Sequence, residues 1–189
     1  MQIRFSEELT TVLRYARDEA MRTGSYAICA DHLLLGLLRH GENAACLLLE
    51  ELGVDRTAFK RFVDGCLFRD RSVPYSAEDS MGVGRSAQNV INLAALEALK
   101  AGSGEVRSLH LLLALSRVGE TATAAYLAEK GAGTQAMMEK LEARGWKRTA
   151  VSPAPAEAAE TEELRRTMES QIRSLVFITP SAGSGKLPN

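Results

Sequence analysis

Cysteines and aromatic residues are scarce in this chain, and its charges nearly cancel. Only 5% of the 189 residues are aromatic, and the three cysteines, Cys29, Cys46 and Cys66, form no C-x-x-C pair. An odd set of scattered thiols argues against a disulfide framework and against a zinc site. The chain has 23 basic and 24 acidic residues, so its net charge of -1 gives no field that would attract nucleic acid or an anionic membrane.

Segments that would direct the chain to a membrane are also missing. No apolar run approaches the roughly 20 residues that a membrane-spanning helix needs. The N-terminus, Met1–Glu8, lacks the apolar core of a signal peptide. We therefore expect a cytoplasmic protein that binds neither nucleic acid nor membranes.

The motifs of common catalytic sites do not occur either. There is no G-x-S-x-G motif. Gly183–Lys186 looks like part of a phosphate-binding loop, but Pro180 and Leu187 stand where that motif needs a glycine and a hydroxyl. His32 and His110 lack the cluster of further ligands that zinc requires, and we expect each to be a partly buried histidine hydrogen-bonded to the neighbouring loop. The sequence predicts a protein that is not an enzyme and has no metal or cofactor.

What the chain does contain is a long internal duplication. The segment Asp31–Glu42 recurs, with changes, as Leu109–Glu120, 78 positions later. The match extends without a gap over residues 12–53 and 90–131, where 18 of 42 positions are identical. Such a repeat indicates one supersecondary module built twice and packed on itself, because each copy has an apolar face that it cannot bury alone.

Apolar periodicity predicts four helices in each copy and therefore an all-α fold. The second helix of each copy is almost wholly apolar, so we expect it to be central. In the fourth helix of copy one, Phe59, Phe62, Val63 and Leu67 are expected to face inward. No segment alternates as a strand does. The predicted helices are Glu7–Arg22, His32–His40, Ala44–Leu52 and Arg56–Phe68 in copy one, and Ser86–Ala101, Leu109–Val118, Ala122–Glu129 and Thr134–Arg144 in copy two.

Composition divides the chain into a globular domain, residues 1–146, and a C-terminal segment, residues 147–189. Repeat one covers about residues 5–68 and repeat two about residues 83–145, and we expect the connection Arg69–Met81 to be an exposed loop. A Pro-containing linker, a charged helix over Glu157–Leu175 and a disordered end follow the domain. In that helix, apolar residues recur at threes and fours and predict weak docking: Leu164, Met168, Ile172 and Leu175.

The repeated segments resemble the Clp N-terminal domain of the ClpC type, the double four-helix module that precedes the ATPase rings of Clp unfoldases. The likeness covers about residues 3–145 and occurs twice in register. It implies two pseudo-symmetric four-helix repeats packed into one domain. The residues that carry it are Phe5-Ser6, Ala16, Glu19-Ala20, Asp31–Arg39, Gly41-Glu42, Leu52–Asp55, Leu109–Leu115 and Gly119-Glu120.

The resemblance also implies a candidate ligand site. ClpC-type domains read phosphorylated arginine with a hydroxyl at the start of each repeat and an acid just before the repeated histidine. Ser6 and Asp31 occupy these positions in copy one, whereas Gly84 and Leu109 in copy two should not bind. Helix capping by Ser6 and Asp31 is the alternative, since each precedes or opens a predicted helix.

For function, the resemblance implies a non-enzymatic accessory or adaptor of a Clp ATPase–protease system. Its partners would be the Clp ATPase or the Clp peptidase, together with substrate or adaptor proteins. The sequence ends where the family would begin its first ATPase ring, so we expect a stand-alone protein without these rings. Two alternatives stay open: a structural subunit that docks on the peptidase ring and modulates its assembly, and the N-terminal fragment of a ClpC-type unfoldase.

Overall fold

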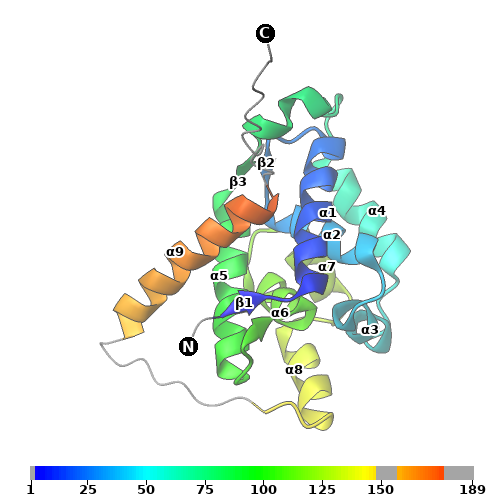
Figure 1. Cartoon of the computed structure of the whole chain (residues 1–189). Coiled ribbons are helices and arrows are strands. Elements are labelled where there is room, and N and C mark those ends of the chain that lie inside the picture. The colour runs from blue at the N-terminus through cyan, green and yellow to red at the C-terminus, as the bar shows by residue number, and fades with distance from the viewer. Residues whose placement is uncertain (1–2, 148–156, 177–189) are drawn as a thin grey trace.

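The computed structural model describes residues 3–147 and 157–176 and has the all-α fold predicted from the sequence (Figure 1). Each repeat supplies four helices, and a further helix follows them. Repeat one contains α1 (Glu7–Thr23), α2 (Ala30–His40), α3 (Ala44–Glu51) and α4 (Arg56–Leu67). Repeat two contains α5 (Arg85–Lys100), α6 (Ser108–Arg117), α7 (Ala122–Glu129) and α8 (Thr134–Ala143), and the last helix is α9 (Glu157–Val176).

Local capping residues explain where several helices begin and end. The side chains of Asn43, Asp55 and Thr121 accept hydrogen bonds from backbone N–H groups in the first turns of α3, α4 and α7, which satisfies donors that have no partner within the helix. Helices α1 and α5 are followed by Gly24 and Gly102, whose φ angles are 84° and 66°. These left-handed conformations are most accessible to glycine.

No segment of the sequence alternates as a strand does, yet four strands of two residues each occur among the described residues. They are β1 (Arg4–Phe5), β2 (Ala27–Ile28), β3 (Gly82–Val83) and β4 (Glu105–Val106). The pairs β1–β4 and β2–β3 are parallel. A shift of 78 positions turns β1 into β3 and β2 into β4, so each pair joins a strand of one repeat to a strand of the other. Strands this short show no alternation that a sequence pattern could reveal.

The connection between the repeats is more ordered than predicted. It contains a 3-10 helix, Tyr75–Ser80, and buries Val73 and Met81 against the core. The backbone N–H of Val73 donates to the carbonyl of Met21 over 2.8 Å. The connection therefore packs along the end of α1, although Tyr75 itself is exposed.

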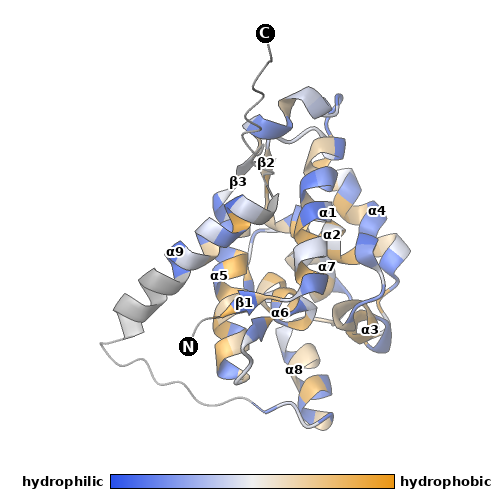
Figure 2. Cartoon of the chain, in the orientation of Figure 1, coloured by the Kyte–Doolittle hydropathy of each residue, from blue (hydrophilic) through white to orange (hydrophobic). Residues whose placement is uncertain are grey.

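One apolar core runs through both repeats, and α2 and α6 lie within it as predicted. Leu34 of α2 and Leu112 of α6 are completely buried, and Figure 2 shows long apolar segments in α3, α5 and α6. The prediction for Phe62 is only partly right: it is 37% exposed and lies at the edge of the core. Its ring packs on Tyr126 of α7 with centroids 5.2 Å apart.

Helix α9 packs against α1 and α5, crossing in front of α5 in Figure 1. Met168 and Ile172 are buried there, as their spacing predicted, whereas the side chains of Leu164 and Leu175 lie outside the described residues. The predicted linker and disordered end, including Gly183–Lys186, also lie outside them. No helix among the described residues is both long enough and apolar enough to cross a membrane.

Candidate functional site

Ser6 lies at the N-terminus of α1 and caps it. Its backbone is extended, and its Oγ accepts a hydrogen bond from the N–H of Leu9 over 3.1 Å. The backbone N–H of Ser6 donates to the carbonyl of Val106 over 3.1 Å. This residue therefore continues the β1–β4 pair into α1, and the capping role expected as the alternative is confirmed for Ser6.

Asp31 lies in the first turn of α2, yet its carboxylate caps a helix of the other repeat. One oxygen accepts from the N–H and from the hydroxyl of Thr123, over 2.8 and 2.6 Å, and the other accepts from the N–H of Ala122 over 3.3 Å. The side chain of Thr123 is fully buried and Asp31 is only 8% exposed. A carboxylate at the N-terminus of α7 also interacts favourably with the helix dipole.

These contacts correct the expectation that Asp31 caps its own helix. Residue 31 is the second residue of α2 rather than the residue before it, so its side chain is free to turn toward α7. Binding of a phosphoarginine by Asp31 would have to draw the carboxylate away from three donors. Phosphoarginine recognition by Ser6 and Asp31 stays a prediction.

Copy two has no counterpart of this arrangement. Gly84, at the start of α5, has no side chain for capping, and Leu109 is partly buried against the core. The position equivalent to Thr123 is Ala45, which is buried. The α2–α7 contact thus joins an acid of repeat one to a threonine of repeat two. The equivalent positions of α6 and α3 hold two apolar residues, Leu109 and Ala45.

A second pair of capping hydrogen bonds between the repeats is symmetric. The N–H of Ser108, at the start of α6, donates to Glu8 of α1 over 3.3 Å. The equivalent N–H of Ala30, at the start of α2, donates to the hydroxyl of Ser86 of α5 over 3.2 Å. The first helix of each repeat therefore caps the second helix of the other.

The two repeated histidines have a structural role, as predicted. His32 Nδ1 accepts from the N–H of Cys29 over 3.0 Å, and Nε2 lies 2.9 Å from the hydroxyl of Thr23. His110 Nδ1 accepts from the N–H of Arg107 over 2.9 Å, but its buried Nε2 has no hydrogen-bond partner in the described structure. The difference arises because Ala101 stands where Thr23 stands in copy one.

Burial keeps both imidazoles neutral. Loss of solvation lowers the pKa of His32 to about 4, against an opposing effect of Asp31 and with a further lowering by Arg22 and Arg69. Loss of solvation, helped by Arg107, likewise lowers the pKa of His110 to about 4. Burial also raises the pKa of the Cys29 and Cys46 thiols, so both are protonated and poorly nucleophilic at neutral pH.

Sequence reasoning missed two ion pairs in which a buried carboxylate meets a partly exposed arginine. Glu19 of α1 lies 3.4 Å from Arg39 of α2, and Glu97 of α5 lies 2.6 Å from Arg117 of α6. Both carboxylates are almost fully buried. All four residues are among the identities of the two copies, which is the signal that could have revealed them. They fix α1 on α2 and α5 on α6.

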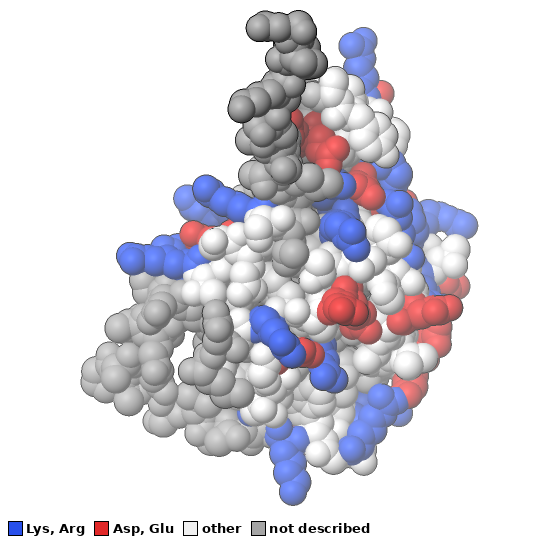
Figure 3. All heavy atoms as spheres, viewed as in Figure 1, with Lys and Arg blue, Asp and Glu red and all other residues white. Residues whose placement is uncertain are grey.

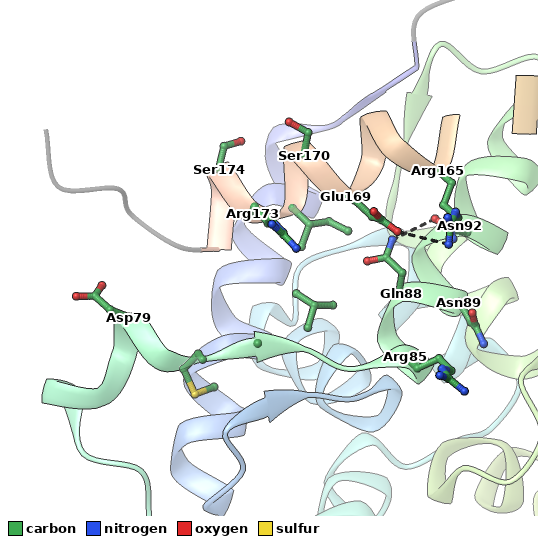
Figure 4. Close-up of a pocket in the computed structure, with 14 residues that line it drawn as sticks. Asp79, Arg85, Gln88, Asn89, Asn92, Arg165, Glu169, Ser170, Arg173 and Ser174 are labelled. Atoms are coloured by element: carbon green, nitrogen blue, oxygen red, sulfur yellow. Dashed lines mark hydrogen bonds and ion pairs between the residues drawn. The ribbon is translucent and has the colours of Figure 1, made fainter. Parts of the chain in front are cut away.

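A groove lies beside α9, between this helix and α5 (Figure 4). The lining includes Met81, Val83 and Ile172, together with polar side chains of α5. In Figure 4, Gln88, Asn92, Arg165 and Glu169 point toward one another across it. This groove is mostly open and polar at its rim. The polar side chains that line it are Asp79 on the connection between the repeats, Arg85, Gln88, Asn89 and Asn92 on α5, and Arg165, Glu169, Ser170, Arg173 and Ser174 on α9.

Away from this groove, we searched the described residues for metal-binding groups and for charged patches. No group of three or more histidine, cysteine and carboxylate side chains that could hold a metal ion occurs within residues 3–147 and the described part of α9. On the face shown in Figure 3, basic and acidic side chains are interspersed with uncharged ones.

Comparisons with known proteins agree with this organisation. The model of the Clp repeat (R) N-terminal domain family matches residues 4–130. The chain is 31% identical over 176 residues to the negative regulator of genetic competence ClpC/MecB of Bacillus subtilis (strain 168), covering 93% of this chain and 21% of that protein. It is 30% identical over 185 residues to the chaperone protein ClpB of Oceanobacillus iheyensis, covering 97% of this chain and 22% of that protein.

Among solved structures, the Hsp104 N-terminal domain from Candida albicans is similar, with a TM-score of 0.61 at 18% identity. That likeness covers 76% of this chain and 93% of the other, and it concerns the fold. The chain spans about one fifth of the length of the curated relatives described above. The match of the family model over residues 4–130 means that the chain belongs to the Clp repeat N-terminal domain family.

Proposed function

We propose that this chain is a non-catalytic, protein-binding component of a Clp ATPase–protease system. In this role it holds substrate or adaptor proteins on the surface of its repeats. The observation that carries the proposal is the extent of the match: 93–97% of the chain aligns with ClpC/MecB and ClpB.

The second candidate is that the chain is the N-terminal region of a ClpC-type unfoldase. The share of the relatives that it covers, 21% and 22%, favours this candidate. Both candidates place the repeats at the point where the Clp machine meets other proteins.

A pull-down from native lysate tests the proposal. Tagged residues 1–189 serve as bait, and an unrelated helical protein with the same tag serves as control. An adaptor should retain the Clp ATPase, and adding it should change the degradation rate of a retained substrate. Recovery of the peptidase without the ATPase would instead favour a subunit of the peptidase ring. Recovery of neither, relative to the control, would contradict a role in the Clp system.

Phosphoarginine recognition by Ser6 and Asp31 needs its own test. Calorimetric titration of the full chain with free phosphoarginine should show saturable binding that Asp31→Ala abolishes. Glu42→Ala removes an exposed acid outside the candidate site and provides the matched control. Absence of heat on titration, or binding unchanged in Asp31→Ala, would leave capping as the sole role of these residues.

A further inference from the structure

Helix α9 covers a surface to which both repeats contribute. It packs on α1, the first helix of repeat one, and on α5, the first helix of repeat two. Ile172 shares a groove with Met81 and Val83 next to the β2–β3 pair, and Gln171 lies beside Arg4 and Arg107 at the β1–β4 pair. This single helix therefore reaches the places where the two repeats are joined.

One observation separates α9 from the fold beneath it. The duplication contains no second copy of α9, so the helix is an addition to a pseudo-symmetric body. The family model matches residues 4–130 and therefore ends before both α8 and α9. Helix α9 lies on a surface that the two repeats together present.

The contact that holds α9 is narrow. Met168 and Ile172 are buried, at 0% and 1% exposure, and they lie four residues apart on one face of the helix. Arg165, Ser170, Arg173 and Ser174, in contrast, are exposed. Within residues 165–174, the helix is amphipathic with one apolar pair and a largely basic and polar outer face.

We propose that the face formed by α1 and α5 is a binding surface for amphipathic helices, and that α9 is its resident occupant. The ligand class is a helix with two apolar side chains four residues apart and with basic flanks. A partner helix of this chemistry competes with α9 for the surface. The inference rests on the proposed protein-binding function and names the surface that performs it.

The fit of α9 defines what this surface accepts. The floor provides apolar groups, Met81 and Val83. The rim provides the amide side chains of α5 together with one acid, Asp79, and one base, Arg85. Amides donate and accept hydrogen bonds, so the rim tolerates varied polar flanks. Recognition of a helix by its apolar pair in a groove is an established mode of protein binding.

A peptide-binding experiment on the full chain tests the proposal. The probe is a fluorescein-labelled synthetic peptide of residues 157–176, and the readout is fluorescence anisotropy. Met168→Asp/Ile172→Asp should release the resident helix, and this variant should bind the peptide at least tenfold more tightly than the wild-type chain. Arg166→Asp changes the charge of α9 by the same two units at an exposed position that does not line the groove, and it should bind like the wild type. A peptide carrying the two apolar-to-Asp changes should not bind.

Two outcomes would overturn the proposal. One is a Met168→Asp/Ile172→Asp variant that melts cooperatively but binds the peptide no better than the wild type. The other is loss of cooperative melting in this variant, which would show that α9 is an integral part of the core. Hydrogen exchange gives a check without mutation, because excess free peptide should accelerate exchange of the resident α9 amides and leave those of α2 unchanged. None of these readouts uses Clp components, so a failed pull-down and a failed peptide test are distinguishable.

Discussion

At the scale of single residues, equivalent positions of the two copies perform different tasks because their partners differ. Asp31 accepts three hydrogen bonds from the start of α7, where Thr123 supplies both an N–H and a hydroxyl. Leu109, at the equivalent position, is partly buried beside the core. The position equivalent to Thr123 is Ala45, which has no hydroxyl to donate to a carboxylate. The hydrogen-bonded acid and threonine therefore occur together at one of the two equivalent places and at the other both are replaced.

The capping role of Asp31 predicts a loss of stability on substitution. Asp31→Ala should lower the free energy of unfolding by about 2 kcal/mol, since it leaves the N–H groups at the start of α7 without their acceptor. Urea unfolding followed by circular dichroism measures this change. Glu42→Ala, at an exposed position, should change stability by less than about 0.5 kcal/mol. Equal stability of Asp31→Ala and the wild type would contradict the role assigned to this carboxylate.

Thr23 provides a second prediction at this scale. Thr23→Ala removes the acceptor for the buried Nε2–H of His32 and makes copy one resemble copy two, so we expect a cost of about 1–3 kcal/mol. Conversely, Ala101→Thr offers His110 a hydroxyl and should raise stability by about 1 kcal/mol. Thermal unfolding of the two variants measures both effects. If neither variant shifted the melting temperature, the hydrogen bond at His32 would contribute nothing to stability.

At the scale of secondary-structure elements, α2 and α6 hold the molecule together. Both are apolar on nearly every face because other helices surround them, and this is why their sequences are the most similar part of the duplication. Glu19–Arg39 and Glu97–Arg117 then fix the first helix of each repeat against the second. Each buried carboxylate has a second cation nearby, Arg22 for Glu19 and Lys100 for Glu97, so each carboxylate is held by a small ionic cluster.

The central position of α2 and α6 predicts that a charge in either one is not tolerated. Leu34→Asp and Leu112→Asp each place a carboxylate at a fully buried position, a cost of several kcal/mol against a typical total stability of about 5–15 kcal/mol. Each variant should lose cooperative thermal melting by circular dichroism. Leu47→Asp, at an exposed position of α3, is the matched control. Melting of Leu34→Asp near the wild-type temperature would contradict the packing.

The elements also show how much of the fold the sequence could predict. The eight helices of the repeats follow from apolar periodicity and from Gly24, Asp55 and similar end signals, because these act within a few residues of where they stand. The strands do not follow, since Phe5 pairs with Val106, about a hundred residues away, and two residues carry no periodicity. For the same reason, Asp31 could be predicted to cap a helix, but the identity of that helix could not.

At the scale of the whole molecule, the buried histidines make stability depend on pH. The pKa of His32 and of His110 is about 4 in the folded chain, against about 6.5 in an unfolded one. The unfolded chain therefore binds more protons between these values, and stability falls as the pH drops from about 6.5 toward 4. Above pH 6.5 the histidines add no pH dependence.

We predict that the free energy of unfolding falls more steeply with decreasing pH in the wild type than in His32→Gln/His110→Gln. Each histidine contributes up to about 1.4 kcal/mol per pH unit in this window. Urea unfolding at several pH values between 7 and 4 measures the two slopes. The carboxylates contribute equally to the pH dependence of both proteins. The difference between the two slopes therefore measures the contribution of His32 and His110. Identical slopes would show that these two side chains do not titrate between folded and unfolded states as described.

The reciprocal pairing of β1 with β4 and β2 with β3 has a consequence for the symmetry of the chain. Every contact that joins the repeats by a strand or by a helix cap from Glu8 or Ser86 is made in both directions. One repeat expressed alone could make all of them with a second copy of itself, as a twofold-symmetric dimer. The present chain therefore has the organisation of such a dimer within one polypeptide, in which equivalent positions such as Asp31 and Leu109 hold different residues.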